Sequence, residues 1–244
     1  MLTAYHQRLM LSASNIPTPH HTSDYSEPTT VLLLPAFTII ENVTPATVPT
    51  LITEIINKAP TNTSPLEPFS LPRALPAPLP EASPAALKEL TTRPCPHQAL
   101  ILLCSQKTRD ARCGQSAPLL RKELQRHLQP LGLYRDLDDE RSGGVGIYFI
   151  SHVGGHKYSA NMMVYRRPDA FSDKVEMEKP GEGGTVENGH GEPEVGAAQC
   201  IWLARVKPED CEGIVKFTVL QGKVVKPASQ LRGGFDRAKG LMSW

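Results

Sequence analysis

Two pairs of residues in this sequence have the types and the spacing of metal ligands. Cys104 and Cys113 have eight residues between them, and His152 and His156 have three, with a Gly-Gly pair among them. Thiolate and imidazole are the ligands that zinc and iron–sulfur centres prefer. The cysteine spacing is wider than the zinc-finger knuckle of about two to four intervening residues. It also differs from the Cys-x-x-Cys of a thioredoxin-type dithiol. The two pairs together favour one shared site.

The elements around these residues predict a sheet that holds both pairs at one edge. The apolar run Gln98–Leu103 predicts a fully buried strand that ends next to Cys104, and Val145–Val153 predicts a second strand that reaches the histidines. A helix with leucines on one side is expected after Cys113, with Ser116 as its N-cap. This helix would return the chain to the same edge of the sheet.

The rest of the C-terminal half continues the alternation of strands and helices. Ser159–Tyr165, Cys200–Val206 and Lys223–Val225 are expected to be strands, and Glu209–Leu220 is expected to be a short helix. The Gly/Glu-rich stretch at about 172–198 is aperiodic, and we expect a disordered surface loop there. This order of elements predicts an α/β domain over residues 95–244.

Residues 1–94 differ in composition, because most of the 23 prolines precede Cys95. Pro60–Pro84 has the composition of an extended Pro/Ser/Ala linker. Thr30–Ile40 is expected to be a buried strand that Pro35 confines to an edge or a bulge. Ala46–Lys58 has helical spacing. The sequence therefore predicts a Pro-rich, partly ordered N-terminal segment, or an incomplete N-terminal domain.

Charge and hydropathy exclude several classes of protein. The formal net charge is +1, which argues against a strongly basic nucleic-acid-binding protein. The longest apolar run, Val31–Ile40, is too short and too broken by Pro35 to span a membrane. The N-terminus lacks the pattern of a secretory signal, and five cysteines do not suit a secreted disulfide framework. We expect an intracellular protein with neither a nucleic-acid partner nor a membrane span.

Three segments resemble the sucrase/ferredoxin-like family, which includes proteins of the altered-inheritance-of-mitochondria type: Leu103–Pro118, Ile150–Tyr165 and Ile201–Val206. The resemblance implies a thioredoxin-like [2Fe–2S] ferredoxin domain on the C-terminal side. It implies four ligands of the cluster, Cys104, Cys113, His152 and His156. Asn161 matches the same pattern and is expected to hydrogen-bond near the cluster. Members usually carry an additional N-terminal stretch, so the first half of this chain is expected to be shortened.

Such a cluster predicts a non-enzymatic electron carrier or redox sensor that serves an unidentified redox partner. Replacing two thiolates by neutral imidazoles makes reduction easier, with potentials of roughly −150 to +300 mV against about −400 mV for all-cysteine plant-type clusters. Two alternatives remain open. One is a thioredoxin-like thiol oxidoreductase that uses Cys104 and Cys113 directly. The other is a structural zinc protein in which the same four residues close a tetrahedral site.

The sequence ends in Met242-Ser243-Trp244. This tail resembles the one that the cytosolic iron–sulfur assembly targeting complex recognises, where a free carboxylate beside an aromatic ring offers a charge and an apolar plug. The tail predicts the targeting complex as a transient partner and a cytoplasmic location. The mitochondrial name of related proteins makes the mitochondrion the alternative compartment.

Overall fold

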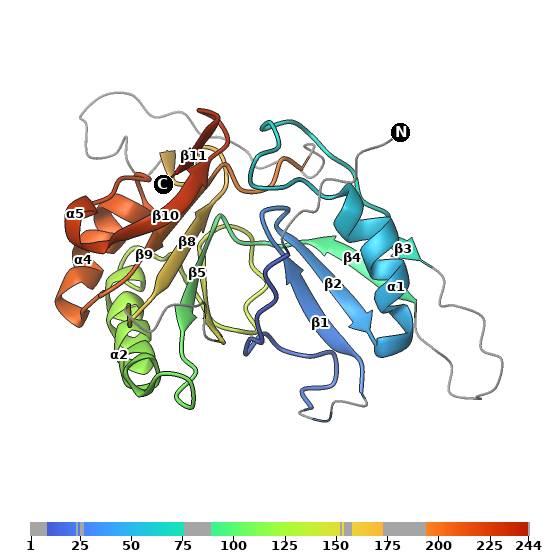
Figure 1. Cartoon of the computed structure of the whole chain (residues 1–244), viewed down its shortest axis with the longest axis horizontal. Helices are drawn as coiled ribbons and strands as arrows, with labels where there is room; N and C mark the ends of the chain where they lie inside the picture. The colour runs from blue at the N-terminus through green and yellow to red at the C-terminus, as the bar shows by residue number, and fades with distance from the viewer. Residues whose placement is uncertain are drawn as a thin grey trace.

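The structure is a computed structural model, and it describes residues 9–22, 24, 27–75, 89–151, 153, 158–172 and 194–243. Two β-sheets lie side by side, one built from the N-terminal part of the chain and one from the C-terminal part (Figure 1). The expected mixed α/β class is confirmed, whereas the likeness to thioredoxin stays a prediction.

The first sheet has four antiparallel strands in the order β1-β2-β4-β3. The strands are β1 (Thr29–Leu33), β2 (Thr38–Val43), β3 (Ala74–Leu75) and β4 (Leu90–Pro94). The prediction of one strand over Thr30–Ile40 is wrong, because the run folds into the β1–β2 hairpin. Pro35 lies in the turn, where its missing N–H interrupts no ladder, and Phe37 takes a positive φ of 55° there.

The first sheet has an apolar core of its own. The expected helical segment at Ala46–Lys58 is confirmed as four consecutive pieces: η1 (Pro45–Thr47), α1 (Val48–Thr50), η2 (Leu51–Ile55) and η3 (Ile56–Lys58). Leu51 and Ile55 of this segment pack with Ile40 of β2 and Leu90 of β4, and each of these four side chains is buried. The Pro-rich half of the chain therefore contains a packed unit.

The second sheet has seven strands in the order β11-β10-β9-β8-β5-β7-β6. Its strands are β5 (Ala99–Cys104), β6 (Tyr134–Arg135), β7 (Val145–Ile150), β8 (Met162–Arg166), β9 (Gln199–Leu203), β10 (Leu231–Asp236) and β11 (Leu241–Ser243). The β5–β7 and β6–β7 pairs are parallel, and the other pairs are antiparallel. The expected strands near Gln98–Leu103, Val145–Val153, Ser159–Tyr165 and Cys200–Val206 are confirmed, with shifted ends.

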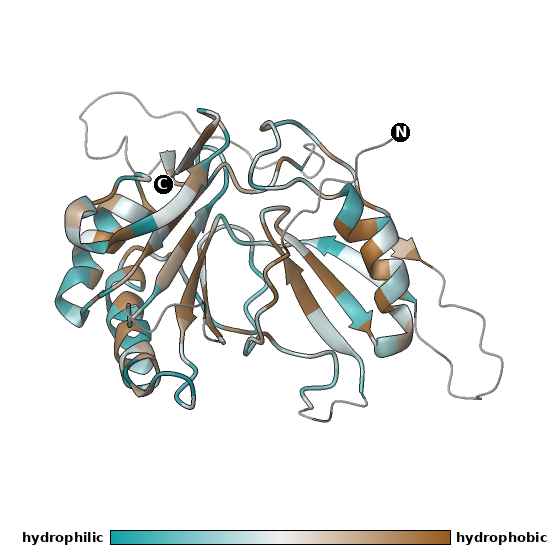
Figure 2. Cartoon of the chain, in the orientation of Figure 1, coloured by the Kyte–Doolittle hydropathy of each residue, from teal (hydrophilic) through white to brown (hydrophobic). Residues whose placement is uncertain are grey.

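Helices cover one face of the second sheet, and the first sheet packs toward the other. The helices are α2 (Ala111–Leu128), η4 (Pro208–Asp210), α4 (Cys211–Gly213), η5 (Ile214–Val219) and α5 (Pro227–Gln230). Alternate β5 residues such as Ile101 and Leu103 pack under α2. Leu100, Leu102 and Cys104 face the other way and share a core with Phe37 and Ile39 of the first sheet. Figure 2 shows β5 as hydrophobic along its length, as a strand buried on both faces requires.

One expectation for the C-terminal half is wrong. Lys223–Val225 is irregular chain, and the strands that complete the sheet are the unexpected β10 and β11. Residues 173–193 of the expected loop lie outside the described residues, but residues 194–198 are packed. The Ala197 N–H donates to the Pro35 carbonyl at 2.7 Å, and Glu194 pairs with Arg167 at 2.7 Å. Within the described chain, no helix is long and apolar enough to cross a membrane.

We predict that the protein becomes less stable in acid because of His97, which lies between β4 and β5. Burial lowers the pKa of its imidazole from 6.5 to about 4. In the unfolded chain His97 is therefore protonated below about pH 6.5, whereas in the folded chain it is protonated only below about pH 4. The free energy of unfolding should fall as the pH drops through this window, by at most about 3 kcal/mol from this group. Urea unfolding from pH 7 to pH 4 should show a shallower decline for His97→Gln than for the unmodified chain, and equal declines would contradict this assignment.

Candidate functional site

The two predicted cysteine ligands meet where β5 ends and α2 begins. Cys104 is the last residue of β5, and Cys113 lies in the first turn of α2. Their side chains hydrogen-bond to each other, and their residues are 1% and 0% exposed. All five cysteines of the chain lie in the described part, and none forms a disulfide. The paired spacing therefore brings two thiols to one buried place.

The helix that carries Cys113 begins earlier than expected. Its N-cap is Asp110, whose side chain accepts the Arg112 N–H at 3.0 Å, so the expected cap at Ser116 is wrong. The Cys113 N–H donates to the Asp110 carbonyl at 3.0 Å. The Asp110 side chain satisfies one of the free N–H groups at the start of the helix, six residues before Ser116. Cys113 is therefore held by helical hydrogen bonds rather than by a loop.

Gly114 lets the segment between the two cysteines fold back on this helix. A side chain at Gly114 would place its Cβ 2.6 Å from the Cβ and 2.8 Å from the Cα of Lys107. Contacts under about 3 Å are too close for carbon atoms, so only glycine allows this approach without a shift of the backbone. The close approach places Lys107, in the turn after β5, against the first turn of α2.

His152 and His156 lie outside the described residues, but residues on both sides of them are described. The backbone of Val153, directly after His152, hydrogen-bonds to the Cys104 side chain. The Ser105 N–H donates to the carbonyl of Ile150 at 3.0 Å. The parallel pairing of β5 with β7 places Cys104 opposite Ile150. Ile150 and Val153, which flank His152 in the sequence, thus lie beside Cys104.

The chain after the histidine segment is tied to the same strand end through Asn161. The Asn161 carbonyl accepts the Cys104 N–H at 3.0 Å. The Asn161 side-chain amide donates to the Tyr158 carbonyl at 2.9 Å, and its Oδ1 accepts from Nη1 of Arg232 at 2.7 Å. The expectation that Asn161 hydrogen-bonds near the site is consistent with this position. Asn161 is 1% exposed, so each of these hydrogen bonds is made away from water.

Arg232 is the one member of this network that the sequence did not indicate. Its guanidinium lies 4.4 Å from the ring centroid of Tyr158 and 4.6 Å from that of Trp202. Stacking on two aromatic faces and donation to a buried amide fix the guanidinium in place. Arg232 belongs to β10, a Gly-rich strand that hydropathy alone did not reveal. The Arg232 side chain thus links β10 to Trp202 of β9, to Tyr158 and to Asn161.

Burial and hydrogen bonds oppose each other at the Cys104 thiol. Burial is the main cause that raises the pKa of Cys104 to about 11; the neighbouring Cys113 acts in the same direction, and backbone hydrogen bonds from Val153 and Gln106 act in the opposite one. At neutral pH the chain by itself therefore holds a protonated, weakly nucleophilic thiol at Cys104. This disfavours direct thiol–disulfide chemistry at this position.

The donors around the cysteines suit a sulfur-rich inorganic group. Two backbone N–H groups face the Cys104 sulfur. Trp202 packs against the core that contains the cysteines, and its Nε1–H is buried and has no hydrogen-bond partner in the described part of the chain. Sulfur atoms of iron–sulfur clusters accept hydrogen bonds of this kind. The described residues hold no group of three or more His, Cys, Asp or Glu side chains that would bind a metal ion, and both histidines lie outside that part.

The remaining cysteines have separate surroundings. Burial raises the pKa of Cys95 to about 11 and those of Cys200 and Cys211 to about 12. Cys200 hydrogen-bonds to the Tyr165 side chain, and Cys211 lies in the core beneath α2. Cys200 and Cys211 are thus buried free thiols.

One family model and several relatives match the chain. The sucrase/ferredoxin-like family model matches residues 1–233. Actin patches distal protein 1 of Saccharomyces cerevisiae is 49% identical over 145 residues, which are 57% of this chain and 37% of that protein. Altered inheritance of mitochondria protein 32 of Debaryomyces hansenii is 33% identical over 127 residues, 52% of this chain and 33% of that protein. The matched part of the chain thus spans about a third of the length of these relatives. No solved structure matches.

Proposed function

The chain belongs to the sucrase/ferredoxin-like family, and we propose that it is an iron–sulfur redox protein, an electron carrier or redox sensor. Its [2Fe–2S] cluster would be held by four side chains, Cys104, Cys113, His152 and His156. The observation that supports this most is the meeting of the Cys104 and Cys113 side chains with the backbone of Val153, the neighbour of His152. The two cysteines and the residue that follows His152 in the sequence therefore lie at one end of one sheet.

The ligand set divides into an anionic and a neutral half. Cys104 and Cys113 would supply two thiolates, and His152 and His156 two imidazoles. When bound, the cluster supplies one-electron transfer at a potential raised by the loss of two ligand charges. Backbone hydrogen bonds from Val153 and Gln106 favour the ionised Cys104 sulfur. Binding of a metal ion is what would overcome the cost of ionising this buried thiol.

The surrounding residues would set the environment of the cluster. The Cys104 and Cys113 side chains share an apolar core with Leu102 and Met163, which limits the access of water. Arg232 of β10 adds a positive charge, and its hydrogen bond to Asn161 holds that charge in place. Asn161 in turn accepts the N–H of Cys104. A fixed positive charge favours an added electron, so this arrangement supports an easily reduced centre.

Metal analysis tests the proposal against its alternatives. The chain should be purified without oxygen, reconstituted with iron and sulfide, and analysed for iron, acid-labile sulfide and zinc. We expect a red-brown protein with about two iron and two sulfide ions per chain. A colourless protein that binds one zinc ion would establish the structural zinc reading instead. A colourless, metal-free protein whose Cys104 and Cys113 cycle between dithiol and disulfide would establish the oxidoreductase reading.

The C-terminal residues are proposed as the contact with the cytosolic iron–sulfur targeting complex. Met242 and Ser243 lie in β11, where Met242 pairs with Phe235 of β10, and Trp244 lies outside the described residues. We therefore propose the cytoplasm as the compartment, with the mitochondrion as the alternative that the names of the relatives suggest.

Deletion of Trp244 should separate targeting from binding. Cluster occupancy of the protein isolated from cells should fall several-fold, whereas reconstitution in vitro should reach the same occupancy as the full chain. The ratio of iron to protein measures both. Unchanged occupancy in cells would refute the role of the tail, and an equal loss in vitro would assign Trp244 to the cluster site itself.

A further inference from the structure

A short segment near the start of the chain lies along the outer edge of β7. The two-residue strand β6 pairs with Val145 and Gly146, at the beginning of that edge. Residues 13–16, here called the strap, lie along its later part, where Ser14 forms an antiparallel bridge with Ile150. Strap and strand are more than a hundred residues apart in the sequence, since Asn15 and its partner in β7 are separated by 134. The strap is therefore a long-range addition to the second sheet.

Hydrogen bonds in two pairs hold the strap to this edge. The Asn15 N–H donates to the Phe149 carbonyl at 3.3 Å, and the Asn15 Oδ1 accepts the Phe149 N–H at 2.7 Å. The Ser151 N–H donates to the Ala13 carbonyl at 2.7 Å, and the Ser151 Oγ accepts the Ala13 N–H at 3.1 Å. The strap thus holds backbone groups of the last turnless stretch before His152.

The cysteine side of the site holds the same stretch from its other edge. The residue after Cys104 donates its N–H to the Ile150 carbonyl at 3.0 Å. The backbone of Val153 hydrogen-bonds to the Cys104 side chain. His152 lies between Ser151 and Val153 in the sequence. The residue before it is therefore bound to the strap, and the residue after it is bound to a proposed cluster ligand.

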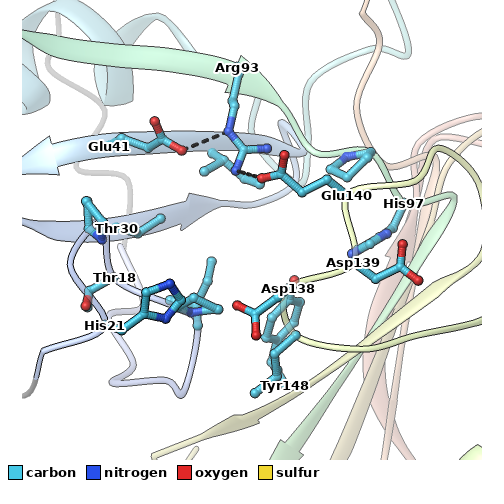
Figure 3. A pocket seen from close by; sticks show the side chains of 16 residues that line it. Thr18, His21, Thr30, Glu41, Arg93, His97, Asp138, Asp139, Glu140 and Tyr148 are labelled. Atoms are coloured by element: carbon cyan, nitrogen blue, oxygen red, sulfur yellow. Dashed lines mark hydrogen bonds and ion pairs between the residues drawn. The ribbon is translucent and has the colours of Figure 1, made fainter.

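The strap is anchored on both sides of Asn15. Before Asn15 the anchor is the hydrogen bonding described above, and after it Ile16 packs against the core that contains the two cysteines. Farther along, Thr18 and His21 line a pocket of about 320 Å³ between the two sheets, together with Tyr148 of β7 (Figure 3). The strap is therefore held in register with β7 by packing as well as by hydrogen bonds.

We infer that Asn15 is a positioning residue for the histidine side of the proposed cluster site, an inference that rests on the proposed function. Its Oδ1 fixes the end of β7 through the Phe149 N–H, and the same strap binds Ser151, the residue before His152. Groups that orient metal ligands without touching the metal change metal affinity strongly. Loosening the strap should therefore loosen the point from which the histidine segment begins.

Replacement of Asn15 tests this inference in two states of the protein. Asn15→Ala removes the Oδ1 acceptor, and Asn15→Asp keeps an oxygen acceptor at the same position. In the metal-free chain, hydrogen exchange at the Phe149 and Ser151 amides, followed by NMR, should be about fivefold faster in Asn15→Ala, the value of one net hydrogen bond. After reconstitution with iron and sulfide, iron should be released to a chelator faster by about the same factor. The EPR spectrum should also broaden, because the imidazoles are held less uniformly. Asn15→Asp should restore all three.

Thr18→Ala is the matched control. The Thr18 Oγ1 accepts the Thr22 N–H at 3.0 Å, so this variant removes a side-chain to backbone hydrogen bond within the same segment rather than one to β7. It should leave amide exchange at Phe149, iron release and the EPR spectrum unchanged. Equal acceleration of iron release by Thr18→Ala would show general loosening of the N-terminal segment and overturn the inference.

Two further outcomes separate this inference from the proposed function. Faster amide exchange in Asn15→Ala, with iron release and the EPR spectrum unchanged, would give Asn15 a purely structural role and overturn the inference alone. An unmodified chain that takes up no iron and sulfide would overturn the proposed function, and this inference with it.

Discussion

Cys104→Ser and Cys113→Ser are each expected to leave the protein without its cluster after anaerobic reconstitution. Serine oxygen is a hard, weakly acidic ligand that replaces a soft thiolate poorly. Both positions are buried and in contact, so no water-exposed side chain can take their place. Iron and sulfide per chain should fall at least about tenfold, together with the visible absorption.

Cys211→Ser is the matched control for these variants. Cys211 is 0% exposed like Cys113, but it lies in the core beneath α2 and away from the thiol pair. The same change of sulfur to oxygen should cost some stability there and leave the iron content unchanged. Thermal unfolding of the three variants separates loss of metal from loss of fold. Retention of iron by Cys104→Ser, or loss of iron by Cys211→Ser with the fold intact, would contradict the assignment of ligands.

Arg232→Ala is expected to have the second-largest effect, on stability and on the cluster together. It removes the donor to the buried Oδ1 of Asn161 and two guanidinium–ring contacts, to Tyr158 and Trp202. An unsatisfied buried acceptor and two lost cation–π contacts cost roughly 2–4 kcal/mol in total. The loss of the nearby positive charge should also lower the reduction potential. Urea unfolding and a redox titration measure the two effects.

Two further variants, Arg205→Ala and Arg232→Lys, show which interaction of Arg232 causes the loss of stability and the change in reduction potential. Arg205 also lies over the Tyr158 ring, at 5.0 Å, but donates no hydrogen bond to Asn161, so its removal should cost less. Arg232→Lys keeps the charge and loses the planar stacking, so it should restore much of the potential and little of the stability. Equal effects of Arg205→Ala and Arg232→Ala would show that the hydrogen bond to Asn161 is not what matters.

The parts of the site that the sequence predicted are those with strong local signals. The continuous apolar runs at Gln98–Leu103 and Val145–Val153 correspond to β5 and β7, and their parallel pairing sets Cys104 opposite Ile150. The sequence alone does not fix the start of α2, because Asp110 and Ser116 are both good N-cap residues; in the structure Asp110 is the cap, and Lys107 lies against Gly114 of the first turn. That contact depends on the folded loop and has no local signature.

Other features depend on contacts between distant segments. β10 has the sequence LRGGFD, in which Gly234 approaches the Cys200 carbonyl so closely that a Cβ would lie 1.9 Å away. Two glycines weaken the hydropathy pattern of a strand, so Arg232 was not recognised as part of the site. The many prolines of the first half do not indicate its four-stranded sheet, in which Pro35 lies in the β1–β2 turn and Pro94 at the end of β4. His97 gave no signal either, since its burial arises only where the two sheets pack.

The central claim is a [2Fe–2S] cluster with two cysteine and two histidine ligands. The most direct test is the low-temperature EPR spectrum of the anaerobically purified, reduced protein beside that of the His152→Cys/His156→Cys double variant. We predict a Rieske-like spectrum that moves toward the all-cysteine ferredoxin type in the variant, together with a lower reduction potential. A spectrum that does not change in the variant, or a protein that stays colourless after reconstitution with iron and sulfide, would contradict the account.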